Sequence, residues 1–221
     1  MEEQTKQEAC PATASEGTIT KEQAAFLGKW LSILFWLIVP TTIANSLCSQ
    51  AAAQTAPQLV LPGQLLSLGC AICYAAVLFK MKRCSRHYVL AGICTLISSV
   101  IALGNYFVTG HPELIQYATA LSLPGLAVAL IGLYQECKAN AQVIKPVDPA
   151  MSRKWGRLWN WMLLSYLGTF GGMLLGILHP TIGAMILLVS SFLTVILGLL
   201  ELMYLFRTAH LFCQYAKHTE V

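Results

Sequence analysis

The chain has 221 residues, of which 56% are hydrophobic and only 11% are charged, and its mean hydropathy is +0.62. These values exclude an ordinary water-soluble domain and place the chain in a membrane. The formal net charge of +4 does not indicate a nucleic-acid partner, because the basic residues occur in short clusters beside apolar segments, where membrane topology accounts for them.

The first 25 residues are polar and lack apolar periodicity, so residues 1–25 are predicted to form a flexible cytoplasmic tail. The end of this tail is more regular. Thr20 is followed three residues later by Gln23, which is the spacing of a capping box. This pair predicts a helix that starts near Lys21 and runs on into the first apolar segment.

Six apolar segments follow, each of about twenty residues or more, which is the length that a helix needs to cross a roughly 30 Å hydrocarbon core. The predicted spans cover about 26–47, 59–79, 88–108, 114–134, 155–178 and 182–206. Pro40 in the first span and Pro124 in the fourth are expected to bend their helices. The longest connection, 135–153, carries Pro146 and Pro149 and is not expected to be a continuous helix, and residues 207–221 are predicted to form a second cytoplasmic tail.

Basic residues set the predicted orientation. If the amino terminus is cytoplasmic, all fourteen Lys and Arg residues lie on the inner side or in the first inner turn of a span, and the outer loops hold Glu113 as their one fixed charge. The predicted fold is an all-α integral membrane protein of six transmembrane helices arranged as three out-and-back hairpins, with both termini cytoplasmic. The expected location is the cell (plasma) membrane.

Two segments, 29–39 and 154–164, share a pattern in which Lys-Trp is followed six residues later by a second Trp. Both segments lead directly into a predicted span, where basic and aromatic side chains favour the interface between membrane and water. We interpret the leading pair of each segment as anchors at the inner interface: Lys29, Trp30, Lys154 and Trp155.

The second tryptophans, Trp36 and Trp161, lie about 9 Å deeper at 1.5 Å per residue. We interpret them as packing residues and expect them where the two repeated helices meet. The third span also begins with a basic and aromatic group at 86–88, so the three hairpins are interpreted as internal repeats. Chance resemblance between apolar segments is the alternative.

A charge in the hydrocarbon core is costly and marks function, but no Asp, Glu, Lys, Arg or His is expected at mid-depth. The nearest is Glu201, six residues before Arg207 and therefore about 9 Å along the helix from it. We interpret Glu201 as an interfacial charge that holds the bundle together by an ion pair. A proton or cation site is the alternative.

Uncharged polar residues gather at one predicted depth, the outer third of the bilayer. They form a candidate pocket open to the outside: Asn45, Gln64, Asn105, Gln116 and Tyr117. The alternative is that these side chains form hydrogen bonds between helices or face the lipid headgroups.

Gly168, Gly172 and Gly176 recur every four residues in the fifth span, so one face of that helix is bare backbone that another helix can approach closely. The partner is expected to be a helix of the same bundle. A second copy of the chain, a partner membrane subunit or a ligand are the alternatives.

The sequence contains no hydrolase motif, no Gly-rich phosphate-binding loop and no residues with metal-ligand spacing. We therefore expect no enzyme activity, no catalytic residue, no metal and no cofactor. The first functional hypothesis is an accessory or scaffold subunit that acts through helix contacts in the lipid bilayer, as a homo-oligomer or with a partner membrane subunit. The second is a substrate-binding or transport component for a small, largely uncharged solute. A cavity at the depth of Asn105 favours the second, and a filled bundle with an exposed Gly168 face favours the first.

Overall fold

The computed structural model describes residues 19–48, 56–109, 113 and 115–218, so most of the predicted amino-terminal tail lies outside the described residues. Every regular element within these ranges is a helix. Six are long, and two short 3-10 turns, η1 (Pro57–Leu59) and η2 (Met81–Arg83), flank the second of them. The long helices are α1 (Lys21–Leu47), α3 (Val60–Lys80), α4 (Arg86–Thr109), α5 (Ile115–Ile144), α6 (Pro149–Leu178) and α7 (Pro180–His218).

Five of these helices are long and apolar enough to cross a membrane, which identifies the chain as a multipass membrane protein. They are α1, α3 with η2, α4, α6 and α7. Helix α5 is not among the five found in the described ranges. The six-span count and the cytoplasmic position of the termini therefore stay predictions.

The starts of two helices are fixed by their caps. The Thr20 hydroxyl accepts a hydrogen bond from the backbone N–H of Gln23 at 3.3 Å, and the Gln23 side chain accepts one from the backbone N–H of Thr20 at 3.3 Å. This arrangement confirms the predicted capping box. Helix α6 starts at Pro149, where the Asp148 carboxylate accepts from the N–H groups of Ala150 and Met151, both at 2.9 Å.

Two helices extend beyond the apolar spans predicted for them, and the predicted break in 135–153 is present but shorter. Helix α5 continues to Ile144, so the connection expected over 135–153 shrinks to residues 145–148. Helix α7 continues to His218, so most of the predicted carboxy-terminal tail is helical. The physical reason is the same in both cases. Where a helix becomes amphipathic its mean hydropathy falls, although the helix itself continues. Cys137, Val143 and Phe212 are all buried in the bundle.

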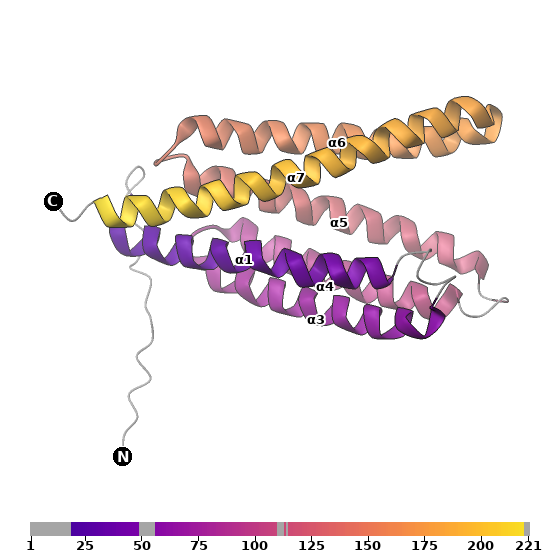
Figure 1. Cartoon of the computed structure of the whole chain (residues 1–221), viewed down its shortest axis with the longest axis horizontal. Helices are drawn as coiled ribbons and strands as arrows, with labels where there is room; N and C mark the ends of the chain where they lie inside the picture. Colours follow the sequence, from indigo (N-terminus) through magenta and orange to yellow (C-terminus); the bar gives the residue numbers. More distant parts are fainter. Residues whose placement is uncertain (1–18, 49–55, 110–112, 114, 219–221) are drawn as a thin grey trace, which may run out of the picture.

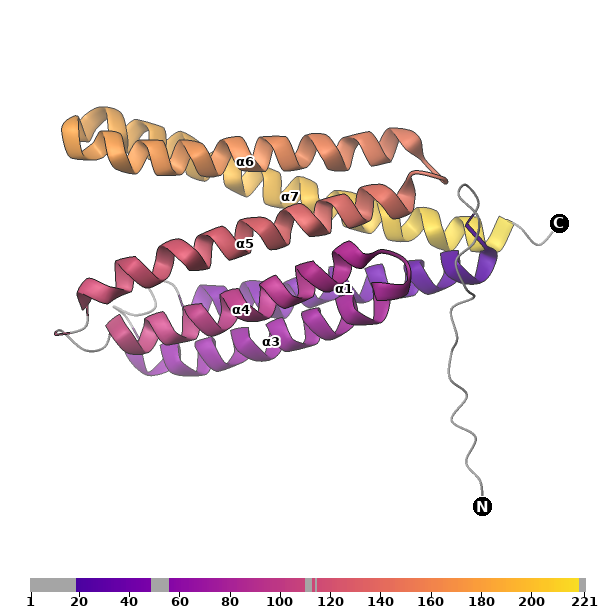
Figure 2. The same ribbon diagram turned by 180° about the vertical axis from the view of Figure 1, so that it is seen from behind.

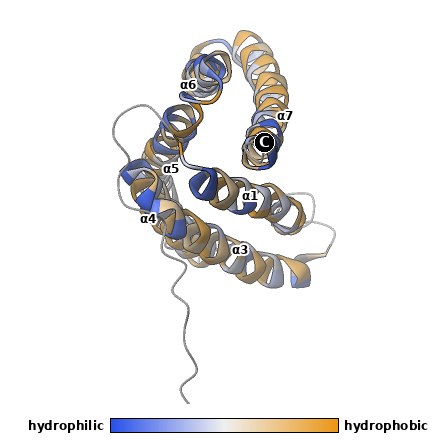
Figure 3. Cartoon of the chain, turned by 90° about the vertical axis from the view of Figure 1, so that its left-hand side faces the viewer, coloured by the Kyte–Doolittle hydropathy of each residue, from blue (hydrophilic) through white to orange (hydrophobic). Residues whose placement is uncertain are grey.

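Each long helix packs against two others, and the contacts close a ring. In order around it, α1 contacts α3, α3 contacts α4, α4 contacts α5, α5 contacts α6, α6 contacts α7 and α7 contacts α1. Figure 3 shows this ring from one end, and Figure 1 shows that successive helices run in opposite directions. The predicted hairpins are thus neighbours in space as well as in sequence.

The best-packed core lies at the end of the ring where α1 begins and α7 ends (Figure 1). Large side chains that are almost completely buried come from every helix there: Leu27, Leu31, Leu34, Leu78, Tyr88, Ile144, Met151, Trp155 and Phe212. Toward the opposite end the α6–α7 hairpin diverges from the other four helices, as Figure 1 and Figure 2 both show. The ring is therefore tightly closed at one end only.

The expected contact between the repeated tryptophans is wrong. Trp36 is 68% exposed and Trp161 is 54% exposed, and they lie on α1 and α6, which the ring places apart. Helix α1 instead packs closely on α7, where a Cβ at Gly28 would lie 2.7 Å from the Cys213 sulfur. Sequence spacing predicts the depth of both tryptophans, but the helix neighbours decide which way a side chain faces.

Candidate functional site

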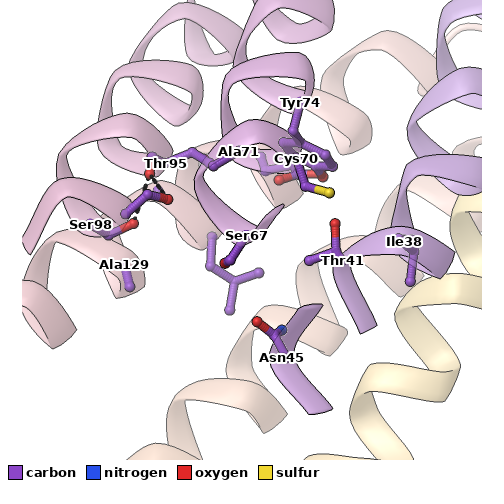
Figure 4. A pocket seen from close by; sticks show the side chains of 14 residues that line it. Ile38, Thr41, Asn45, Ser67, Cys70, Ala71, Tyr74, Thr95, Ser98 and Ala129 are labelled. Carbon is purple, nitrogen blue, oxygen red and sulfur yellow. Dashed lines mark hydrogen bonds between the residues drawn. The ribbon is translucent and has the colours of Figure 1, made fainter. Parts of the chain in front are cut away.

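A cavity of about 360 Å³ lies between α1, α3, α4 and α5, a volume within the range of small-molecule pockets. Each helix contributes side chains at helical spacing, which brings them to one face. The polar lining consists of Thr41 and Asn45 from α1, Ser67 and Tyr74 from α3, Thr95, Ser98 and Ser99 from α4, and Glu136 from α5. Figure 4 shows Asn45, Thr41 and Ser67 around one shared space.

Close helix packing positions two walls of this cavity. A Cβ at Gly132 would lie 2.9 Å from the Cβ of Cys94, and a Cβ at Gly125 would lie 2.9 Å from a methyl carbon of Ile101. Helices α4 and α5 therefore approach each other closely along this length. Because Gly132 precedes Glu136 by one helical turn, the same face of α5 that packs on α4 also carries the carboxyl group to the cavity.

Glu136 is the one formally charged side chain among the described residues that line the cavity. It is 8% exposed, and its Oε1 accepts a hydrogen bond from the Tyr74 hydroxyl. Within the described part of the chain, that is the one hydrogen bond to this carboxyl group. A buried carboxylate needs such partners, because removing an unpaired charge from water is expensive.

Four hydroxyl groups of the lining, on α1 and α4, are already used as donors. Thr41 donates to the Leu37 carbonyl at 2.8 Å, and Thr95 donates to the Ala91 carbonyl at 2.9 Å. Ser98 and Ser99 both donate to the carbonyl of Thr95, at 3.0 and 2.8 Å. Each hydroxyl has a single proton, so what these groups offer to the cavity is the acceptor lone pairs of their oxygens.

A smaller cavity of about 120 Å³ lies on the other side of α5, against α6 and α7. Its polar lining includes Ser165, Thr194 and Glu201, and Leu133 lines both cavities. The hydroxyls of Ser165 and Thr194 lie 2.7 Å apart. Glu201, expected at the membrane interface, is partly buried here, on the opposite side of α5 from Glu136.

The predicted polar pocket is only partly assembled. Asn45 lines the larger cavity, whereas Gln64 and Asn105 are not part of its lining. The Asn105 side-chain oxygen is buried and has no hydrogen-bond partner within the described residues. Tyr117 is 57% exposed and turned away, and the side chain of Gln116 lies outside the described residues.

The glycine face of α6 is covered by α7. A Cβ at Gly168 would lie 2.5 Å from the Ser190 hydroxyl oxygen, and one at Gly172 would lie 3.0 Å from Ile186. Gly176 faces Gly183, where an added Cβ would overlap the Gly176 Cα. The bare backbone therefore serves the packing of the last hairpin.

The four proposed anchors divide into two kinds. Lys29 is exposed, and its ammonium group lies 6.0 Å from the centroid of the partly buried Trp30 ring. Lys154 is partly buried, but Trp155 is only 1% exposed and its indole N–H donates to the Thr208 hydroxyl at 3.1 Å. Trp155 is a core residue, packed inside the bundle.

Glu136 is the functional candidate that the sequence reading missed. It follows the predicted end of the fourth span at residue 134, so it was assigned to a connection outside the membrane. A signal was present, since no helix breaker occurs between Pro124 and Pro146, and Gly132, Leu133 and Glu136 have the spacing of one helix face. Continuing the helix past its apolar part would have placed this carboxyl group in the bundle.

In the described ranges, no group of three or more His, Cys, Asp and Glu side chains is arranged to hold a metal ion. No protein-family model matches the chain, and no curated protein or solved structure matches it either. A functional assignment therefore depends on the cavity and its residues.

Proposed function

We propose that this membrane protein is a binding or transport component for a small polar solute. The observation that carries the proposal is the cavity lined by polar side chains of α1, α3, α4 and α5, in a chain whose other surfaces are strongly apolar. Polar groups inside a membrane bundle are costly and mark solute pathways.

The shape of the ring supports the same proposal. The packed core closes the bundle at the end where α1 begins and α7 ends, and the cavity lies beside this core, with Tyr74 packed against it and Asn45 farther along α1. A solute site near the middle of helices that close at one end is the arrangement expected of alternating access.

The competing hypothesis of an accessory or scaffold subunit loses one of its supports. The glycine face of α6, which could have received another subunit, packs on α7 of the same chain. The solute-binding hypothesis is therefore favoured, and the lipid bilayer is the one partner that it requires.

The test compares two serines in apolar parts of the helices. Ser67 of α3 lines the cavity, whereas Ser191 of α7 is exposed and is not part of the lining, so Ser67→Leu fills the site while Ser191→Leu is a matched control. In purified protein in mild detergent, at least one member of a panel of small amines, amides, polyols and carboxylates is expected to raise the melting temperature. The shift should persist in Ser191→Leu and disappear in Ser67→Leu. An absence of any shift across the panel in all three proteins would overturn the proposal.

A further inference from the structure

The charge inside the larger cavity is of one sign. Glu136 is the one formally charged residue in its described lining, and Glu201 lies behind Leu133 on the other side of α5. Both carboxyl groups lie inside the bundle, where an ionised carboxylate calls for a compensating positive charge. An ionised Glu136 gives the cavity a negative field that no described residue of its own lining neutralises.

The uncharged polar residues of the lining also favour a ligand that donates hydrogen bonds. The hydroxyl protons of Thr95, Ser98 and Ser99 are all donated to carbonyl oxygens of α4, so these groups meet a ligand as acceptors. The Tyr74 proton is donated to Oε1 of Glu136, so that donor is occupied too. Apart from the Asn45 amide and the Ser67 hydroxyl, the polar groups of the described lining therefore meet a ligand as acceptors.

Such a lining suits a ligand that is itself rich in donors and positively charged. An ammonium group has several N–H donors and no acceptor, and Oε2 of Glu136 receives no hydrogen bond within the described residues. The volume argues against a bare metal ion, because ion sites hold their ligands in direct coordination, whereas about 360 Å³ accommodates an organic molecule.

We propose that the cavity binds a small organic ammonium ion, with Glu136 as its counter-ion, Tyr74 as the residue that orients the carboxyl group, and the α4 hydroxyls as further acceptors. This inference rests on the proposed function and names its substrate class. Glu136 is the binding residue, and Tyr74 acts through it.

The experiment changes the functional group of the ligand while its carbon skeleton stays the same. Melting temperature and affinity are measured for the purified protein with cyclohexylammonium, cyclohexanecarboxamide and cyclohexanecarboxylate, and with butylammonium, butyramide and butyrate, with sodium chloride as the inorganic control. The ammonium member of each series is expected to bind, the amide to bind more weakly and the carboxylate not at all. Because it uses the unmodified chain, this comparison does not depend on any variant folding.

The matched variants are Glu136→Gln in the cavity and Glu113→Gln, whose side chain is exposed near the start of α5. Glu136→Gln is expected to weaken ammonium binding by at least about 30-fold, the lower range for removing one partner of a buried charge pair. Glu113→Gln should leave it unchanged. Tyr74→Phe should weaken the ammonium and leave any amide binding unchanged.

The outcomes separate the two proposals. If amide and ammonium bind equally, or if Glu136→Gln binds the ammonium as tightly as the unmodified chain does, the cation inference is overturned while solute binding stands. If sodium ions stabilise the protein and the organic cations do not, the site is inorganic and the inference also fails. If none of the probes binds, both the inference and the proposed function lose their support.

Discussion

At the scale of single residues, Trp155 shows how one hydrogen bond changes the role of a side chain. A tryptophan after a lysine at the start of a span is typical of the membrane interface. Here the indole is buried against Tyr204, with ring centroids 6.0 Å apart, and Thr208 supplies the acceptor that a buried N–H group needs. The threonine is itself 0% exposed, so no solvent competes for this bond.

This pairing predicts the effect of Thr208→Val. The valine keeps the shape of threonine but removes the acceptor, which leaves the Trp155 indole N–H buried without a partner. We expect the free energy of unfolding in mixed detergent to fall by about 1–3 kcal/mol.

The control is Thr42→Val, since Thr42 is exposed on α1 and its hydroxyl donates only to the Ile38 carbonyl of its own helix. Its effect should stay within about 0.5 kcal/mol. Equal losses in the two variants would mean that the indole bond contributes nothing to stability.

At the scale of elements, the last hairpin depends on backbone-to-backbone contact. Helices α6 and α7 meet where Gly176 and Gly183 face each other, and no side chain separates them. Lipid provides no hydrophobic driving force between helices, so this close packing joins the hydrogen bonds of Trp155 and Ser165 in holding the two helices together.

The contact predicts opposite effects of two alanines. In Gly183→Ala the new Cβ would overlap the Gly176 Cα and lie 2.8 Å from the Gly172 carbonyl oxygen, so backbone must move. We expect a loss of about 1–3 kcal/mol in the same unfolding measurement. Gly171→Ala meets nothing within 4 Å and should be neutral or stabilising by up to about 1 kcal/mol. A Gly183→Ala variant as stable as Gly171→Ala would contradict the packing described for this hairpin.

The helices also show which features the sequence can predict and which it cannot. Hydropathy located the apolar parts of the helices, and local chemistry located the start of α1 at its capping box. Hydropathy fails where a helix becomes amphipathic, and for this reason the end of α5 and Glu136 were missed. The cavity itself depends on which helices are neighbours in the ring, and no local pattern contains that information.

At the scale of the whole molecule, the ring of helices indicates whether α5, the one long helix not found among the five candidate spans of the described residues, crosses the membrane. Helix α4 runs from the end of the bundle where α1 begins to the opposite end. Helix α6 starts at the same end as α4 (Figure 2). Both are apolar enough to cross a membrane. Helix α5 lies between them in the chain and packs against both, so we expect it to pass back through the same layer.

This connectivity predicts six crossings, with chain turns that alternate between the two faces of the membrane. Single cysteines at Ala56, Glu113 and His179 should react with an impermeant maleimide from one face, and cysteines at Cys84 and Pro146 from the other, in a background where the remaining cysteines are replaced. The first set is expected to be external, because basic residues favour the cytoplasmic side. The decisive position is Pro146, at the end of α5: if it is labelled from the same face as Glu113, then α5 does not cross, and a ring of six spanning helices is wrong.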